Sequence, residues 1–221
     1  MKLSAQSTRI IAWFISAFVA LLAVVVWGQG VRWNFNDLST YRIFPLFGLL
    51  AFSLMLSVYA VGFLRRRFKI EVTELGNYYK ILSILILTAI LAHPGLLWWQ
   101  LWRDGFGLPP ESYLQHYVAP PLKWVAILGT VSWFVFLAYE FRFRYKDRKW
   151  WRYFEYAGDA AMVAIFYHGL RLGGNLQHGW FRWVWYFYGV VLLLVLIDIY
   201  TRKFKVVDRL NTWAYKDTHG S

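Results

Sequence analysis

The sequence predicts an all-α integral membrane protein with six transmembrane helices and both termini in the cytoplasm. The chain is 59% hydrophobic and 21% aromatic but only 16% charged, which is too apolar for a soluble domain of 221 residues. Its apolar residues gather in six runs, each close to the roughly 20 residues that a helix needs to cross about 30 Å of hydrocarbon. Basic residues gather between alternate pairs of runs, which sets the orientation.

The six predicted spans form a single domain over 1–221 and cover approximately residues 10–28, 43–64, 81–102, 122–140, 154–172 and 181–201. The first span starts near Met1, as a signal peptide does, but its apolar core is too long and no small-x-small cleavage site follows it. The second follows Arg42 and ends at the basic run 65–67. The third follows Lys80 and contains Pro94, which frees a backbone carbonyl one turn earlier.

The fourth span follows the segment 103–123, for which we predict a short interfacial helix between the prolines and a role as a lid over an outer site. The fifth span is unusual because it contains Glu155, Asp159, His168 and Arg171, groups that hydrocarbon solvates poorly. The sixth is again an apolar run. The chain shows no internal repeat.

The distribution of charge predicts the orientation of this multi-pass protein, which we expect in the inner cell membrane. With the N-terminus in the cytoplasm, 18 of the 24 lysine and arginine residues are cytoplasmic and 6 are outside, which is the positive-inside bias. Attraction to anionic lipid head groups accounts for the net charge of +12, so we expect the lipid bilayer as a partner and no nucleic acid. The absence of cysteine excludes disulfides, iron–sulfur clusters and thiol catalysis.

Two histidines are predicted at similar depth in the outer half of the bilayer. His93 lies roughly 20 Å above Lys80, and His168 roughly 24 Å above Arg152, at 1.5 Å per residue. If the two helices face each other, both imidazoles can ligate one metal ion from opposite sides. Haem fits this arrangement better than tetrahedral zinc, which needs further ligands. The alternative is a pair of neutral histidines that only form hydrogen bonds within the bundle.

Three arginines are predicted near the same level. Arg171 follows His168 by one turn, and Arg42 and Arg182 open the second and sixth spans. A guanidinium group matches a haem propionate, and lipid phosphate is the alternative partner for each. His116 and His178 lie in outer loops and His219 in a polar tail, where we assign no site.

Three segments carry a family resemblance: 42-RIFPLFGLLAFSLMLS-57, 76-GNYYKILSILILTAILAH-93 and 149-KWWRYFEYAGDAAMVAIFYH-168. In their order and spacing the chain resembles the ferric reductase-like transmembrane domain superfamily, and within it the MsrQ-type haem-binding membrane subunits, from about Tyr41 to Tyr200. The family pattern implies histidine pairs on spans 3 and 5 that hold an inner and an outer b-type haem. Here the outer positions match, at His93 and His168.

The inner positions of that pattern hold Lys80 and Glu155. We therefore expect one haem b in the outer half and no standard inner haem. Lys80 and Glu155 are predicted either to form an ion pair at the cytoplasmic interface or to line an unconventional inner pocket. Asp159, one turn above Glu155, is either part of a proton relay or a hydrogen-bonded partner of another helix.

The resemblance implies a membrane oxidoreductase subunit, a b-type cytochrome that passes electrons towards the outer face. A quinol or the flavin of a separate cytoplasmic reductase is the expected donor, and a ferric chelate or a periplasmic redox partner protein the expected acceptor. One alternative is a non-redox transporter or scaffold of the same fold, favoured by the missing inner histidines and by the carboxylates Glu155 and Asp159. A haem sensor is the other alternative.

Overall fold

The computed structural model describes residues 5–36, 38–139, 145 and 147–219, and within this part of the chain all regular elements are helical. The long helices are α1 Ala5–Gly30, α2 Thr40–Phe68, α3 Gly76–Arg103, α5 Lys123–Tyr139, α7 Trp151–Leu172 and α8 Phe181–His219. The short elements are η1 Val72–Leu75, α4 Glu111–His116, η2 Pro120–Leu122 and η3 Gly174–Leu176. The all-α fold class is thus confirmed, and α4 lies between the prolines where a short helix was predicted.

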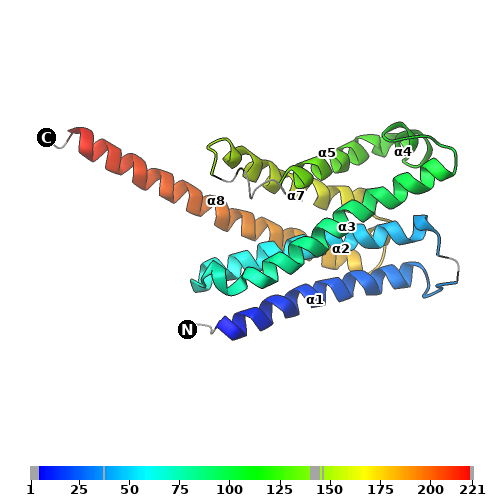
Figure 1. The fold of residues 1–221 in the computed structure, drawn as a ribbon, viewed down its shortest axis with the longest axis horizontal. Helices are drawn as coiled ribbons and strands as arrows, with labels where there is room; N and C mark the ends of the chain where they lie inside the picture. The colour runs from blue at the N-terminus through cyan, green and yellow to red at the C-terminus, as the bar shows by residue number, and fades with distance from the viewer. Residues whose placement is uncertain (1–4, 37, 140–144, 146, 220–221) are drawn as a thin grey trace.

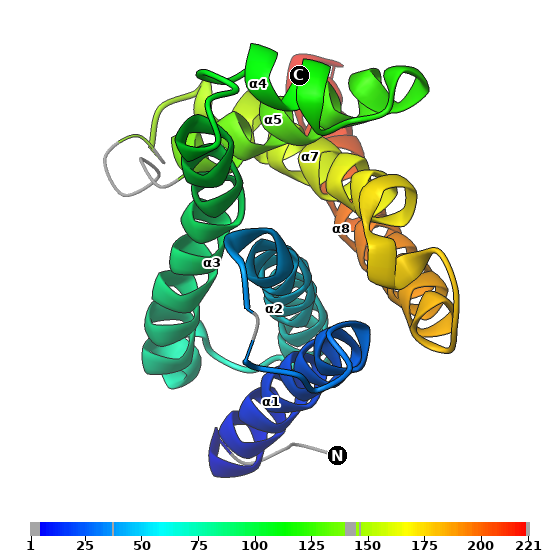
Figure 2. The same ribbon diagram turned by 90° about the vertical axis from the view of Figure 1, so that its right-hand side faces the viewer.

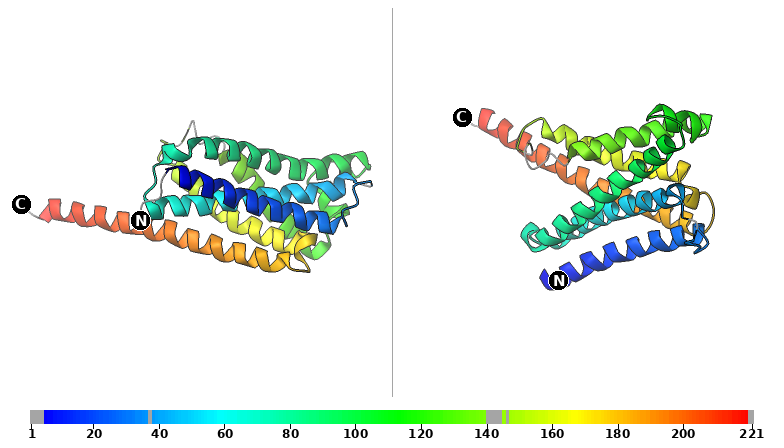
Figure 3. Two further views of the ribbon diagram at one scale, coloured as in Figure 1. Left: turned by 90° about the horizontal axis from the view of Figure 1, so that it is seen from below. Right: turned by 45° about the vertical axis from the view of Figure 1, so that its right-hand side comes forward.

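The long helices run alternately in opposite directions along one bundle (Figure 1). Both chain ends lie at the same end of the bundle, which we call the terminal end, and α4 lies at the opposite end, which we call the α4 end. The final part of α8 continues beyond the other helices at the terminal end (Figure 3). At 1.5 Å per residue its 39 residues extend about 58 Å.

In the described part of the chain, five helical segments are long and apolar enough to cross a membrane: Gln6–Gly30, Thr40–Phe68, Thr73–Arg103, Pro120–Tyr139 and Phe181–Phe204. Their outward side chains are apolar, with Phe14 of α1 and Phe187 of α8 more than 60% exposed. Such surfaces require lipid, so the molecule is a multi-pass membrane protein. The predicted span 154–172 corresponds to α7, whose charged side chains make it less apolar than these five segments.

Helix α2 lies at the centre of the bundle and packs against α1, α3, α7 and α8 (Figure 2). The sequence ends this helix sharply at Phe68, because Lys69 adopts a left-handed conformation with φ of 54° and donates its N–H to the Arg65 carbonyl. Three arginines in the last turn, 65–67, place positive charge where the helix dipole favours it.

Polar contacts fix the outer helices to α2. Ser16 of α1 lies 2.9 Å from both the Ser57 hydroxyl of α2 and the Tyr78 hydroxyl of α3, so three buried hydroxyl groups satisfy one another. At the terminal end, Asp198 of α8 accepts from Arg66 of α2 at 2.9 Å and from Arg202 at 2.8 Å. These contacts connect α1, α3 and α8 to α2 close to the terminal end.

Candidate cofactor site between two helix hairpins

His93 of α3 and His168 of α7 line one cavity, which has a volume of about 680 Å³. Its walls come from α2, α3, α5, α7 and α8, and residues of α4 and the turns beside it cover the α4 end. Cofactor and ligand pockets commonly have volumes of roughly 300–1,000 Å³. The structure therefore brings together the two histidines that the sequence places on separate spans.

The preceding helix α2 holds the His93 side chain. The His93 Nδ1 atom lies 3.0 Å from the Phe44 carbonyl oxygen. A Cβ atom placed on Gly48, one turn further along α2, would lie 2.7 Å from His93 Cε1. The imidazole thus occupies the space that a side chain at position 48 would need.

His168 is held in the same way by α5. Its Nδ1 atom lies 2.9 Å from the Val125 carbonyl oxygen. A Cβ atom on Gly129, again four residues after that carbonyl, would collide with the His168 ring. Each histidine therefore has a backbone carbonyl and a glycine of the preceding helix as neighbours, with the same spacing between them.

The likeness between the hairpins α2–α3 and α5–α7 extends over the cavity wall. Five residues of α2 and five of α5 line the cavity with the same spacing along each helix. Those of α2 are Pro45, Gly48, Leu49, Phe52 and Met55. Those of α5 are Ala126, Gly129, Thr130, Trp133 and Phe136. Ile90, His93, Pro94 and Leu97 of α3 correspond in the same way to Ile165, His168, Gly169 and Leu172 of α7. The positions that line the cavity thus recur in the two hairpins, although most of the side chains at these positions differ and the sequence itself shows no repeat.

The hydrogen bonds to carbonyl oxygens decide the tautomer of both histidines. A carbonyl oxygen only accepts, so Nδ1 carries the proton in each ring and donates it. In a neutral imidazole the other nitrogen, Nε2, then keeps its lone pair. An Nδ1–H bonded to a backbone carbonyl is the arrangement that orients a metal-ligating histidine. In both rings the Nε2 lone pair is therefore left free of the Nδ1 hydrogen bond and has the chemistry of a metal ligand.

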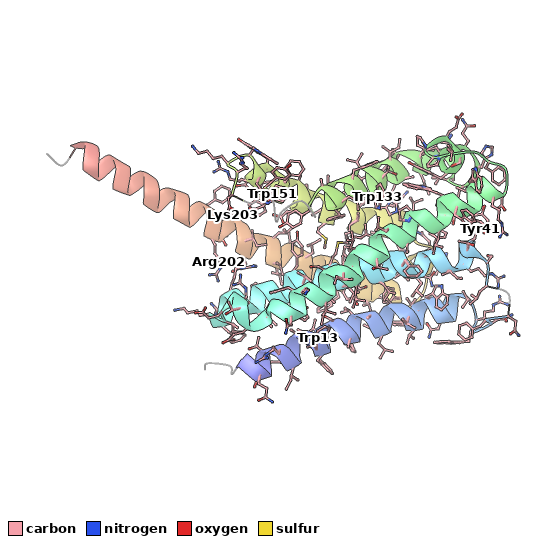
Figure 4. The ribbon with its side chains drawn as sticks, in the orientation of Figure 1. Trp13, Tyr41, Trp133, Trp151, Arg202 and Lys203 are labelled. Atoms are coloured by element: carbon pink, nitrogen blue, oxygen red, sulfur yellow. The ribbon has the colours of Figure 1, made fainter. Side chains whose placement is uncertain are left out.

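A second contact ties the two hairpins together beside His93. Proline has no N–H, so Pro94 leaves the Ile90 carbonyl of α3 without its usual helical donor. The Trp133 indole N–H of α5 donates to that oxygen at 3.0 Å. Figure 4 shows Trp133 on α5, where α3 crosses it. Pro94 thus provides an acceptor that fixes α5, and with it the carbonyl and glycine beside His168, relative to α3.

The segment 103–123, predicted to act as a lid, contributes residues that cover the cavity at the α4 end. Tyr113 and Tyr117 both line the cavity. The Tyr117 ring stacks on Tyr41 with centroids 5.8 Å apart, and the Tyr41 hydroxyl donates to Asp104 at 2.7 Å. Burial raises the pKa of the Tyr117 phenol, so the lid adds no charge to the cavity through this residue.

Of the three predicted arginines, the structure places only Arg171 on the histidine cavity. Arg182 instead donates to the Gln177 carbonyl and to the Tyr186 hydroxyl, each at 2.9 Å. Arg42 lines a separate cavity of about 590 Å³ at the α1–α2 connection. Of the three, Arg171 therefore has the position expected of a propionate partner.

The predicted pairing of Lys80 with Glu155 is wrong. Glu155 lies 3.5 Å from Lys203 of α8, and the exposed Lys80 lies on α3, which has no extensive contact with α7. Asp159 is buried and accepts hydrogen bonds from Tyr59 of α2 at 2.9 Å and Tyr200 of α8 at 3.1 Å. Its role as a hydrogen-bonded partner of other helices is thus realised.

The donor set of the cavity consists of two imidazoles. Among the described residues no group of three or more histidine, aspartate or glutamate side chains is placed to hold a metal ion. His116 stacks on Phe106 with centroids 4.7 Å apart, away from the cavity wall. Two nitrogen ligands are too few for a tetrahedral zinc site, whereas two are enough for a metal whose other ligands belong to a macrocycle.

Comparisons of the chain with protein-family models, curated proteins and solved structures found no match. The site must therefore be interpreted from its own geometry.

Sequence reasoning missed Gly48, Gly129 and Trp133. Glycine in an apolar helix frequently marks close approach of a neighbouring group, which was the available signal. The sequence does not show which group approaches, because the contact joins residues 45 and 39 positions apart in the chain.

Proposed function

We propose that the protein is a membrane b-type cytochrome with one haem, bound by His93 and His168, that carries electrons across the bilayer towards the α4 end. The observation that carries this proposal is the pair of histidines on one cavity, each with Nδ1 bonded to a carbonyl and Nε2 left for a metal ion. The ferric reductase-like superfamily, which the chain resembles, is the corresponding family proposal.

The proposal includes six spans, with α7 as the sixth crossing helix. Its 22 residues extend about 33 Å, enough for a hydrocarbon layer of about 30 Å. It packs along α5, which is apolar enough to span. Its charges have partners or suitable positions: Glu155 pairs with Lys203, Asp159 accepts two hydrogen bonds, and Arg171 lies near the α4 end.

The proposed orientation places the terminal end in the cytoplasm. The basic residues Arg65, Arg66, Arg67, Lys69, Arg148, Lys149, Arg152, Arg202 and Lys203 belong to elements that meet at this end. The positive-inside rule then directs the histidine cavity towards the outer half of the membrane. In a bacterial cell this corresponds to the inner membrane.

The residues have distinct tasks in this proposal. His93 and His168 bind the iron, while Arg171 offers a guanidinium group to a propionate carboxylate. Haem supplies one-electron chemistry. Apolar side chains line most of the cavity, and Tyr113 and Tyr117 of the segment 103–123 cover its α4 end.

The donor is a quinol or the reduced flavin of a separate cytoplasmic protein, and the acceptor is a ferric chelate or a periplasmic partner. The proposed donor is separate from the helical bundle. No histidine pair in the described terminal half of the bundle provides a second haem site, since Lys80 and Glu155 occupy the corresponding positions. The donor must therefore reach the bundle from the terminal end.

The first experiment is a reduced-minus-oxidised absorption spectrum of detergent-purified protein from haem-replete cells, with haem quantified per chain. We expect one b-type haem per chain, reoxidised when a ferric chelate is added. Two haems would contradict the single-site assignment. A colourless protein would overturn the cytochrome proposal in favour of a transporter or scaffold, and a haem that no acceptor reoxidises would favour a sensor.

Gly129→Ala tests whether the glycine beside His168 positions its imidazole ring. Because the new methyl group must displace the His168 ring, we expect haem occupancy to fall about 10- to 100-fold, as for other changes to groups that orient metal ligands. Gly95→Ala is the matched control, since a Cβ at this α3 position meets no atom within 4 Å. Equal haem content in both variants would show that the glycine does not position His168.

A further inference from the structure

Asp159 is a buried carboxylate at the junction of three helices, on the terminal side of the histidine cavity. Only 9% of the residue is exposed. Tyr59 of α2 donates to one carboxylate oxygen at 2.9 Å, and Tyr200 of α8 donates to the other at 3.1 Å. A carboxylate that accepts at both oxygens matches the ionised form, which has no proton to donate.

A continuous set of polar and aromatic groups connects Asp159 to the terminal-end surface. The Tyr200 ring stacks on Tyr156 with centroids 5.9 Å apart. The Lys203 ammonium group lies 4.5 Å from the Tyr156 ring centroid and 3.5 Å from the Glu155 carboxylate. Figure 4 shows Lys203 on α8, towards the terminal end. Water at that surface is therefore within a few side chains of Asp159.

On its other side Asp159 approaches the cavity. Tyr59, which donates to it, lies one helical turn from Met55, and Met55 lines the cavity. Along α7, Asp159 precedes His168 by nine residues, which corresponds to about 14 Å. Charges at this separation still interact in a low-dielectric interior, because little water screens them.

Among the described residues, Asp159 has titratable neighbours on α2, α5, α7 and α8. Tyr59 faces it from α2, Tyr200 and Lys203 belong to α8, and Glu155 precedes it on α7. From α5, the Tyr139 ring lies 3.9 Å from the Cβ position of Gly158, next to Asp159. Asp159 is thus the carboxylate nearest to the cavity in this group, with phenols as its direct partners.

We infer that Asp159 takes up one proton from the terminal-end surface when the cavity receives an electron, and returns it when the electron leaves. The inference rests on the proposed function. One electron would come from the quinol or reduced flavin donor and reduce the bound haem. One proton would come from water and convert the Asp159 carboxylate to a carboxylic acid. The net charge of the buried region is then unchanged, which avoids the cost of an uncompensated charge in the membrane.

The test is a redox titration of the haem between about pH 5 and pH 9 in wild type, Asp159→Asn and Asp198→Asn. Because reduction takes up a proton, the wild-type midpoint potential is expected to fall as the pH rises. The Asp159→Asn midpoint should be independent of pH over the same range. Asp198→Asn is the matched control, since Asp198 is another terminal-end carboxylate but pairs with Arg66 and Arg202.

An infrared difference spectrum of reduced minus oxidised protein gives an independent readout. We expect the carbonyl band of a protonated carboxyl group to appear on reduction in wild type, to be lost in Asp159→Asn and to shift in Asp159→Glu. If Asp159→Asn does not assemble, the test compares the carboxyl band of Asp159→Glu with that of wild type, because this variant keeps a titratable group. A wild-type midpoint that does not change with pH, or an unchanged slope in Asp159→Asn, overturns the inference alone, whereas absence of haem overturns the proposed function.

Discussion

His93→Ala and His168→Ala are each expected to abolish haem binding, with haem per chain falling from one to below detection. Each substitution removes one of the two proposed Nε2 ligands and leaves the opposite imidazole facing the cavity alone. The hydrogen bond to the Phe44 or Val125 carbonyl is lost with it. The measurement is haem content per chain by absorption, on protein whose helix content by circular dichroism matches wild type.

Two controls make this result specific. His116→Ala removes a histidine that stacks on Phe106 outside the cavity, and it should keep full haem content. Imidazole added to His168→Ala should restore part of the binding, because the space of the missing ring can admit it. A variant that retains one haem per chain after either alanine substitution would exclude that histidine as a ligand.

Trp185→Ala is expected to destabilise the bundle by roughly 3–5 kcal/mol, the range for truncating a large buried aromatic side chain. Trp185 is 1% exposed, its ring lies 4.4 Å from that of Phe52 between centroids, and its indole N–H donates to the Phe166 carbonyl at 3.1 Å. It also packs against Gly169, the residue after His168. The loss therefore removes contacts between α2, α7 and α8 together.

The matched control for this prediction is Trp183→Ala on the same helix. Trp183 is 73% exposed and faces away from the core, so its truncation should change the free energy of unfolding by less than about 0.5 kcal/mol. Denaturant titration of the haem-free proteins in detergent, followed by circular dichroism, separates this effect from cofactor binding. Equal destabilisation by the two substitutions would show that Trp185 contributes no more than a surface residue.

Hydropathy predicted most of the fold, because a membrane requires long apolar runs and those runs became the long helices. The predicted span 43–64 lies within α2, and the predicted span 81–102 within α3. Hydropathy did not predict that α8 continues to His219, since its last part is polar and carries no membrane signal. The predicted span 122–140 corresponds to α5, apart from residue 140, which lies outside the described residues.

Depth along a helix predicted one feature of the site correctly and another incorrectly. His93 and His168 share a depth and also a cavity. Lys80 and Glu155 share a depth, yet Glu155 pairs with Lys203. Counting residues gives the height of a side chain but not its direction around the helix axis, and it does not identify the neighbouring helix. Rotation and neighbours depend on packing that a single sequence does not display.

The two hairpins that hold the histidines run in the same sense, since α2 and α5 lead to the terminal end and α3 and α7 lead back. Two copies of one hairpin, related by a two-fold axis along the bundle, would produce the same arrangement of carbonyls, glycines and histidines. The chain thus places two hairpins with equivalent histidine contacts in one molecule, joined by the segment 103–123. Because the two hairpins belong to one chain, each can change independently. The hydrogen bond from Trp133 to the Ile90 carbonyl is such a difference, whereas a dimer of identical hairpins would contain it twice.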